Sequence, residues 1–494
     1  MADPDVHTLI VGAGFSGIGA AIKLDQAGLS DHLIVEAGEQ AGGTWYWNTY
    51  PGIAVDIPSF SYQFSFEQSP DWSRTYAHGH ELKAYADHCV AKYGIGPRIR
   101  YGTEVTGAVF DDTEDVWRVE TSTGSVTARH LINAAGVLNV PKLPDIDGVG
   151  DFAGTTLHTA RWDHRVDLTG KRVAVIGTGA SAVQLIPEIA PLVEQLTVFQ
   201  RTPIWCFPKF DVPLPAPARW AMRLPGGSAV QRALSQAYVE VTFPLSAQYH
   251  GVVPLSKGAE ALGRRYLRSE VPDPVLRDKL TPTYAVGCKR PAFHNTYLST
   301  FSRDNVTLVT EPIAQIRPHG VATTDSVVHD ADILVLATGF KVMDVDSGTF
   351  PVLGSGGRSL AEFWSTQRMQ AYEGVSVPGF PNFFNVCGPY GYVGSSFFAL
   401  IETQTHHIVR CLRRARSAGA TRVEVRREAN DRYFAEMMRK RHRQIFWQDS
   451  CSTANSYYFD SNGDVPLRPA STPEAYWRSR RFPLDDYEFG SERR

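Results

Sequence analysis

The chain has 494 residues, 43% of them hydrophobic and 20% charged, with a formal net charge of -3. This length allows two or three domains with separate cores, and the charge offers no basic field for nucleic acid and no polybasic membrane patch. No apolar run reaches the ~20 residues of a membrane span, and no signal peptide precedes the first predicted strand. We therefore expect a cytoplasmic protein that binds neither nucleic acid nor a membrane.

Six cysteines are spread along the chain without C-x-x-C spacing. This distribution indicates neither a zinc site nor a disulfide framework, so we expect no metal and six buried or inert thiols in a reducing compartment. They are Cys89, Cys206, Cys288, Cys387, Cys411 and Cys451.

The first predicted element is a buried parallel strand at residues 8–11, followed by a G-x-G-x-x-G fingerprint and an Ala- and Ile-rich helix. Glycines there let the backbone approach a pyrophosphate, whose charge the helix N-terminus offsets. Twenty-four positions after Gly12, Glu36 ends the next strand with a carboxylate suited to ribose hydroxyls. The pattern predicts an FAD site comprising Gly12, Gly14, Phe15, Ser16, Gly17 and Glu36.

A loop-rich aromatic stretch and β-rich segments follow, such as residues 117–121, and an apolar strand closes this unit at 130–136. Pro141, Pro144 and Gly148 then mark a linker. The second unit repeats the arrangement, because a strand at 173–176 precedes a second fingerprint and a second helix.

The residue at the matching position of the second unit is a cation. Arg201 stands twenty-four positions after Gly177, where a guanidinium favours a ribose carrying a 2′-phosphate. The alternative is a solvated surface arginine. We predict an NADPH site comprising Gly177, Thr178, Gly179, Ala180, Ser181 and Arg201.

Prolines break regular structure after residue 202, and residues 218–280 carry helical periodicity in pieces. A strand at 333–340 ends in small residues, as the first unit does, and an amphipathic helix is predicted at 397–416. We expect an α/β fold of two Rossmann-like dinucleotide-binding domains, FAD and NADPH, the second inserted in the first, with a helical insertion. The expected parts are 1–138 and 376–494 for FAD, 139–205 and 285–375 for NADPH, and 206–284 for the insertion.

Residues 152–163 resemble the F-x-G-x-x-x-H-x-x-x-W-[P/D] signature of type I Baeyer–Villiger monooxygenases, which are class B flavoprotein monooxygenases. The histidine is His158. A single linker histidine is most often structural, and within the resemblance we expect His158 to position the linker and the nucleotide domain during turnover, not to serve as acid or base.

The resemblance extends over most of the chain. The family's flavin-proximal stretch is matched by residues 42–48, 50–52 and Asp56, although residues 53–55 depart from its usual Ala-Arg-Cys type run. Residues 287–291 look like its active-site arginine segment. The resemblance implies that Asp56 pairs with Arg290, and the alternative is a structural ion pair. It adds Gly43, Thr44, Trp45, Asp56, Thr202, Lys289, Thr338 and Gly339 to the cofactor sites.

The family's activity is the conversion of ketones to esters or lactones with FAD, NADPH and dioxygen through a flavin peroxide, with sulfoxidation as a side reaction. Arg290 would stabilise the peroxide and the developing oxyanion. The insertion and residues 389–394 would help line the ketone pocket, unless their aromatics are core packing. Alternatives are an N- or S-oxygenating flavin monooxygenase, a pyridine nucleotide reductase and a non-catalytic flavin module. We expect a monomer or weak homo-oligomer.

Overall fold

The computed structural model describes residues 3–252, 256–342 and 350–490. Its larger sheet has the parallel strands expected around the first fingerprint, with Leu9 opposite Leu33 and Leu131. The strands are β1 (Val6–Val11), β2 (His32–Val35), β3 (Ile99–Arg100), β4 (Val105–Asp111), β5 (Val116–Thr121), β6 (Gly124–Asn133), β17 (Val352–Leu353) and β18 (Phe383–Asn385). Their order is β17-β4-β5-β6-β1-β2-β3, and β18 also pairs with β6.

The second sheet is parallel throughout and has the order β12-β9-β8-β16-β7. Its strands are β7 (Thr155–His158), β8 (Arg172–Ile176), β9 (Gln195–Phe199), β12 (Val306–Val309) and β16 (Ile333–Leu336). Smaller sheets are formed by β10 (Cys206–Phe207) with β11 (Ala292–Phe293), by β13 (Ile313–Arg317), β14 (Gly320–Thr323) and β15 (Val328–Asp330), and by β19 (Arg422–Val425) with β20 (Tyr487–Gly490).

Helices follow the strands and cover the sheets. They are α1 (Phe15–Gln26), α2 (Thr44–Trp47), α3 (Gly79–Lys92), α4 (Ala180–Ile189), α5 (Ala216–Arg223), α6 (Gly227–Glu240), α7 (Ser256–Glu270), α8 (Pro274–Lys279), α9 (Tyr297–Thr300), α10 (Leu360–Gln367), α11 (Phe397–Ala418), α12 (Arg427–Lys440) and α13 (Thr472–Arg481). The π-helical segment η2 (Val241–Gln248) continues α6. Short 3₁₀ turns are η1 (Gly96–Arg98), η3 (Ser355–Gly357), η4 (Arg441–Arg443), η5 (Ile445–Trp447), η6 (Asp449–Cys451) and η7 (Leu484–Asp486).

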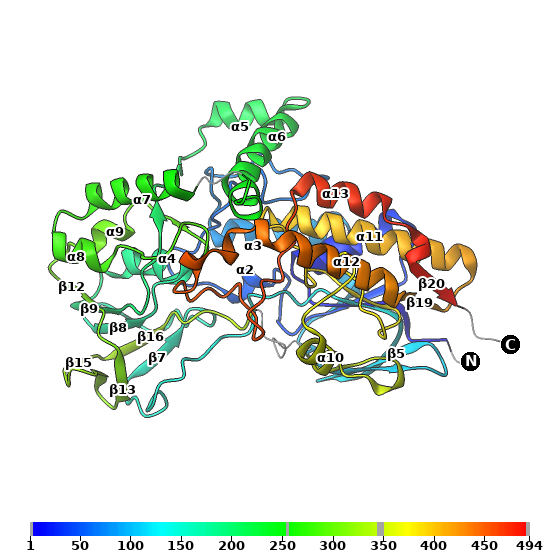
Figure 1. The fold of residues 1–494 in the computed structure, drawn as a ribbon, viewed down its shortest axis with the longest axis horizontal. Helices are drawn as coiled ribbons and strands as arrows, with labels where there is room; N and C mark the ends of the chain where they lie inside the picture. The colour runs from blue at the N-terminus through cyan, green and yellow to red at the C-terminus, as the bar shows by residue number, and fades with distance from the viewer. Residues whose placement is uncertain (1–2, 253–255, 343–349, 491–494) are drawn as a thin grey trace.

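The two sheets form separate lobes. Figure 1 shows the second sheet on the left, β5 with α10 to α13 on the right, and α5 and α6 above. The α/β fold with two nucleotide-binding units is thus as predicted, and α11 covers the amphipathic helix expected at 397–416. The pairing of β17 with β4 places residues 352–353 in the first sheet, ahead of the boundary expected at 375. None of the helices described is long and apolar enough to cross a membrane.

The cysteine prediction was wrong for two of the six residues. Cys288 and Cys451 form a disulfide across a sequence separation of 163 residues. Spacing reports on local motifs, whereas this pair forms because the C-terminal segment packs against the end of the insertion. Cys89, Cys206 and Cys411 are buried thiols, and Cys387 is a partly buried one.

Candidate active site

The first fingerprint connects β1 to the N-terminus of α1. Gly12 has a φ of 100°, and a Cβ there would meet the Ala134 carbonyl oxygen at 2.8 Å, while a Cβ on Gly17 would collide with the Gly12 carbonyl. Phe15, Ser16 and Gly17 open the helix, and no side chain caps it at Gly14. These uncapped amides form a cradle that suits a pyrophosphate.

Glu36 lies beside this cradle and is buried. Its two oxygens accept the backbone N–H groups of Ala13, at 2.6 Å, and Gly38, at 2.8 Å. Burial raises the pKa of Glu36, and these two hydrogen bonds oppose that rise. Each oxygen keeps a lone pair for a ribose hydroxyl, so the donor set fits the adenosine half of FAD.

A second loop closes over the fingerprint. A Cβ on Gly43 would meet the Gly14 Cα at 2.8 Å, so the two loops are in direct contact. The short helix α2 starts here with Thr44 and Trp45, and the Trp45 ring packs edge-on against Tyr62 at 5.8 Å. The structure therefore brings the start of the stretch at 42–48 to the first fingerprint.

The second fingerprint repeats the geometry between β8 and α4. Gly177 has a φ of 113°, and a Cβ on it would approach the Ala337 carbonyl oxygen at 2.5 Å, whereas a Cβ on Gly179 would face open space. Helix α4 begins with Ala180 and Ser181, and no side chain caps it. This open helix N-terminus fits a second pyrophosphate.

Two cations lie together near the second fingerprint. Burial and the neighbouring Arg201 guanidinium lower the pKa of Lys289 to about 8. Such a like-charge pair is costly alone and is relieved by a dianion such as a 2′-phosphate. Thr202 accepts a hydrogen bond from Asn455 at 2.9 Å, and its carbonyl accepts one from Thr178 at 3.1 Å.

His158 ends β7 opposite the last residue of β16. Its Nδ1 accepts the Ala160 amide at 3.0 Å, so the ring proton lies on Nε2, which faces the Thr338 hydroxyl at 3.3 Å. Thr338 donates in turn to the Lys142 carbonyl at 2.6 Å, and the adjacent Gly339 accepts the Lys142 amide. Burial lowers the pKa of His158. A neutral imidazole thus joins the linker to the second sheet.

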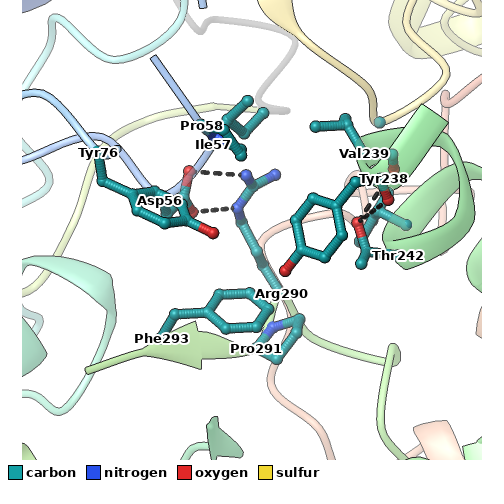
Figure 2. A pocket seen from close by; sticks show the side chains of 12 residues that line it. Asp56, Ile57, Pro58, Tyr76, Tyr238, Val239, Thr242, Arg290, Pro291 and Phe293 are labelled. Carbon is teal, nitrogen blue, oxygen red and sulfur yellow. Dashed lines mark hydrogen bonds and ion pairs between the residues drawn. The ribbon is translucent and has the colours of Figure 1, made fainter. Parts of the chain in front are cut away.

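Asp56 and Arg290 form a bidentate ion pair across 234 residues of sequence. Arg290 donates from Nε to Oδ2 at 2.6 Å and from Nη2 to Oδ1 at 2.8 Å (Figure 2). Burial disfavours both charges, yet the Arg290 charge, with Lys209 nearby, lowers the pKa of Asp56, and Asp56 raises the pKa of Arg290. The guanidinium is therefore permanently charged and held in one orientation.

This ion pair lines a cavity with largely apolar walls. Figure 2 shows the Tyr238 ring of α6 beside Arg290 and Phe293 of β11 below it, while the Thr242 hydroxyl of η2 donates to the Tyr238 and Val239 carbonyls. The Phe243 ring lies 5.8 Å from the guanidinium, and Gly394 packs directly against that ring. The insertion and the loop at 389–394 both reach this cavity, as expected.

Several residues of the site carried no sequence signal. Lys209 holds its ammonium 4.9 Å from the ring of Tyr76, which lines the cavity. Gln184 on α4 accepts the Tyr50 hydroxyl at 2.9 Å and donates to the Ala54 carbonyl at 2.7 Å. It therefore joins the second nucleotide unit to the loop that carries Asp56. These side-chain contacts of Lys209 and Gln184 are tertiary, so no local sequence pattern marks either residue.

Comparisons with known proteins agree with this geometry. A family model described as pyridine nucleotide-disulphide oxidoreductase matches residues 9–213. The chain is 37% identical over 487 residues to a Baeyer-Villiger monooxygenase of Streptomyces coelicolor, covering 98% of this chain and 92% of the relative.

Two solved structures are similar over nearly the whole length. The OTEMO complex with FAD and NADP has a TM-score of 0.88 at 28% identity, covering 99% of this chain and 100% of the other. Cyclohexanone monooxygenase from Rhodococcus sp. Phi1, bound to NADP+, has a TM-score of 0.89 at 28% identity, covering 98% and 99%.

Two dinucleotide sites flanking a charged, aromatic cavity define an NADPH-dependent flavoprotein monooxygenase. Because the similarity extends over nearly the whole chain, it also identifies the family within this class. The chain belongs to the Baeyer–Villiger monooxygenase family. The protein is an oxidoreductase that uses FAD and NADPH for Baeyer–Villiger oxidation.

Proposed function

We propose that Arg290 is the catalytic residue of this oxidation and that Asp56 orients it. When bound, FAD reduced by NADPH would supply the electrons that activate dioxygen, and dioxygen would supply the one oxygen atom that enters beside the carbonyl while its second atom leaves as water. The observation that carries the proposal is the bidentate Arg290–Asp56 pair in the wall of an apolar cavity. A fixed guanidinium there stabilises negative charge on the carbonyl oxygen of the substrate, a contact commonly worth ~3 kcal/mol of barrier.

The cofactor contacts are proposed for the same residues that the sequence singles out. The amides from Gly14 to Gly17 and the carboxylate of Glu36 hold FAD, and the amides that open α4 hold the NADPH pyrophosphate. Arg201, Thr202 and Lys289 hold the 2′-phosphate, which distinguishes NADPH from NADH. His158 positions the linker against the second sheet through Thr338.

The substrate class follows from the cavity lining. Tyr76, Phe243 and Phe293 offer aromatic walls, and Arg290 offers a charged donor for one oxygen. We propose an uncharged ketone with an apolar body, and sulfoxidation as a side reaction. The domain boundaries, the cytoplasmic location and the monomeric or weakly associated state stay predictions.

Isotope labelling of the purified holoenzyme tests this function. With NADPH, ¹⁸O₂ and a panel of cyclic, linear and aryl ketones, we expect an ester or lactone that carries one labelled oxygen. An enzyme that oxygenates amines and sulfides while leaving every ketone unchanged would favour the N- or S-oxygenating alternative.

A further inference from the structure

The disulfide lies beside the residues to which we assign cofactor binding and catalysis. Cys288 immediately precedes Lys289 and Arg290 in the chain, and it is bonded to Cys451 in η6. Both sulfur-bearing residues are buried, at 0% and 3% exposure. The bond therefore attaches the active-site arginine segment directly to the C-terminal part of the protein.

The segment that holds Cys451, residues 445–467, packs against residues of the site, and we call it the cap segment. The Tyr458 ring packs against Phe243 of the substrate cavity, with ring centres 6.2 Å apart. Asn455 donates to Thr202 in the proposed 2′-phosphate site. The cap segment thus touches both the substrate cavity and the NADPH site.

Packing and the disulfide together hold the cap segment in place. Its buried residues Ile445, Phe446 and Leu467 share a hydrophobic cluster with Trp205 and Tyr284, which lie at the two ends of the insertion. The Ile445 side chain also approaches Gly287, the residue before Cys288. Cys288 and Cys451 belong to the same cluster, so the covalent bond joins the cap segment to the arginine segment within this contact.

We propose that Cys288–Cys451 is a redox modification site that fastens the cap segment over the cavity and thereby keeps NADPH consumption coupled to substrate oxygenation. This inference rests on the proposed role of Arg290. Fastening limits water entry to the cavity, where desolvation strengthens the interaction between Arg290 and a negatively charged oxygen.

The chemistry of opening and closing is thiol–disulfide exchange. A dithiol reductant attacks one sulfur, forms a mixed disulfide and leaves as a cyclic disulfide, with both cysteines released as thiols. Hydrogen peroxide reverses the change, because two thiols and one peroxide give the disulfide and two waters. Both cysteines are buried, whereas Ser450 and Ser452 on either side of Cys451 are exposed, so the reaction requires a local opening of η6.

Thiol counting tests the bond itself. The chain has six cysteines, and the structure leaves four of them as thiols, so denatured oxidised protein should titrate four thiols, and dithiothreitol should raise the count to six. Peptide mapping should identify Cys288 and Cys451 as the new pair. Six thiols in peroxide-treated protein before reduction would overturn the proposal.

Coupling tests the consequence. In the reduced holoenzyme and in the Cys288→Ala/Cys451→Ala variant, we expect the share of NADPH that ends as hydrogen peroxide to rise several-fold, with FAD still bound. Chymotrypsin should also cut faster at the exposed Tyr457 in the cap segment. The matched control is Cys411→Ala, which removes a buried thiol from α11 and should behave as the wild type.

Two results would contradict the inference, namely an unchanged ratio of product to NADPH and an unchanged rate of cleavage at Tyr457. If the oxidised wild type oxygenates none of the ketones, the proposed function is wrong. The rate of cleavage at Tyr457 then still shows whether the disulfide fastens the cap segment.

Discussion

Lys289 and Arg201 are the two cations to which we assign the 2′-phosphate of NADPH. Each positive charge disfavours the other, and burial adds to this cost, so the pKa of Lys289 falls to about 8. A 2′-phosphate dianion reverses the balance, because it favours the protonated ammonium. NADPH affinity should therefore be highest below pH 8 and fall as the pH rises through this value, where Lys289 loses its proton.

The Lys289→Met variant tests this account. We expect the KM for NADPH to rise on the order of 10-fold, as for the loss of one charge-assisted hydrogen bond, and its pH dependence near 8 to disappear. The KM for NADH, which lacks the 2′-phosphate, should be unchanged. Steady-state kinetics on both sides of pH 8 measures this, with the exposed Lys279→Met as control. Equal losses with NADPH and NADH would argue against a 2′-phosphate contact.

The sequence predicts single residues best where local geometry is informative. Gly12 and Gly177 have the positive φ that their fingerprints require, and Glu36 lies where its spacing indicates. Lys209 and Gln184 were missed because nothing near them in the chain marks a role. The pairing of Asp56 with Arg290 was expected through family resemblance alone, since 234 residues separate the two.

Among the elements, η2 forms part of the wall of the cavity that we assign to the substrate. Pro244 lies within it and cannot donate a backbone N–H, so a regular α-helix cannot continue, and the chain takes a wider turn. This turn points Phe243 at Gly394, where a Cβ would collide with the ring. The insertion was predicted as helical pieces, but this packing depends on residue 394 and was not predictable from the insertion alone.

Phe243→Ala should enlarge the cavity. We expect kcat/KM for bulky ketones to rise relative to small ones by about 10-fold, the scale of a few apolar contacts in a pocket. A panel of ketones graded by size measures the ratio. Val241→Ala, at an exposed position of the same segment, should leave it unchanged. If Phe243→Ala leaves the ratio of kcat/KM for bulky and small ketones unchanged, η2 is not part of the substrate site.

The strand β7 offers a separate test through His158. The ring is neutral and joins Thr338 to the linker. His158→Ala should therefore slow reduction of FAD by NADPH about 10-fold or more, because a misplaced nicotinamide reacts more slowly. FAD should stay bound. Anaerobic stopped-flow absorbance measures this rate. The exposed His164→Ala is the control. Reduction at the wild-type rate would leave His158 with a purely structural role.

For the molecule as a whole, side-chain contacts join the two lobes. Gln184 connects α4 to the loop of Asp56, and the Arg161 guanidinium lies 4.1 Å from the Trp47 ring centre, joining the linker signature to α2. The sequence predicted both nucleotide units and their order. These two contacts and the disulfide could not be predicted, because they depend on how the units pack.

The central claim is that the fold brings Arg290, from the second half of the chain, to Asp56 so that a fixed charge supports oxygen insertion. Arg290→Ala, studied beside the charge-conserving Arg290→Lys, tests it most directly with two measurements on one preparation, namely anaerobic reduction of bound FAD by NADPH and ester yield in air. We predict normal FAD reduction with ester formation lowered at least ~100-fold in Arg290→Ala and partly retained in Arg290→Lys. Ester formation by Arg290→Ala at the wild-type rate would contradict the account.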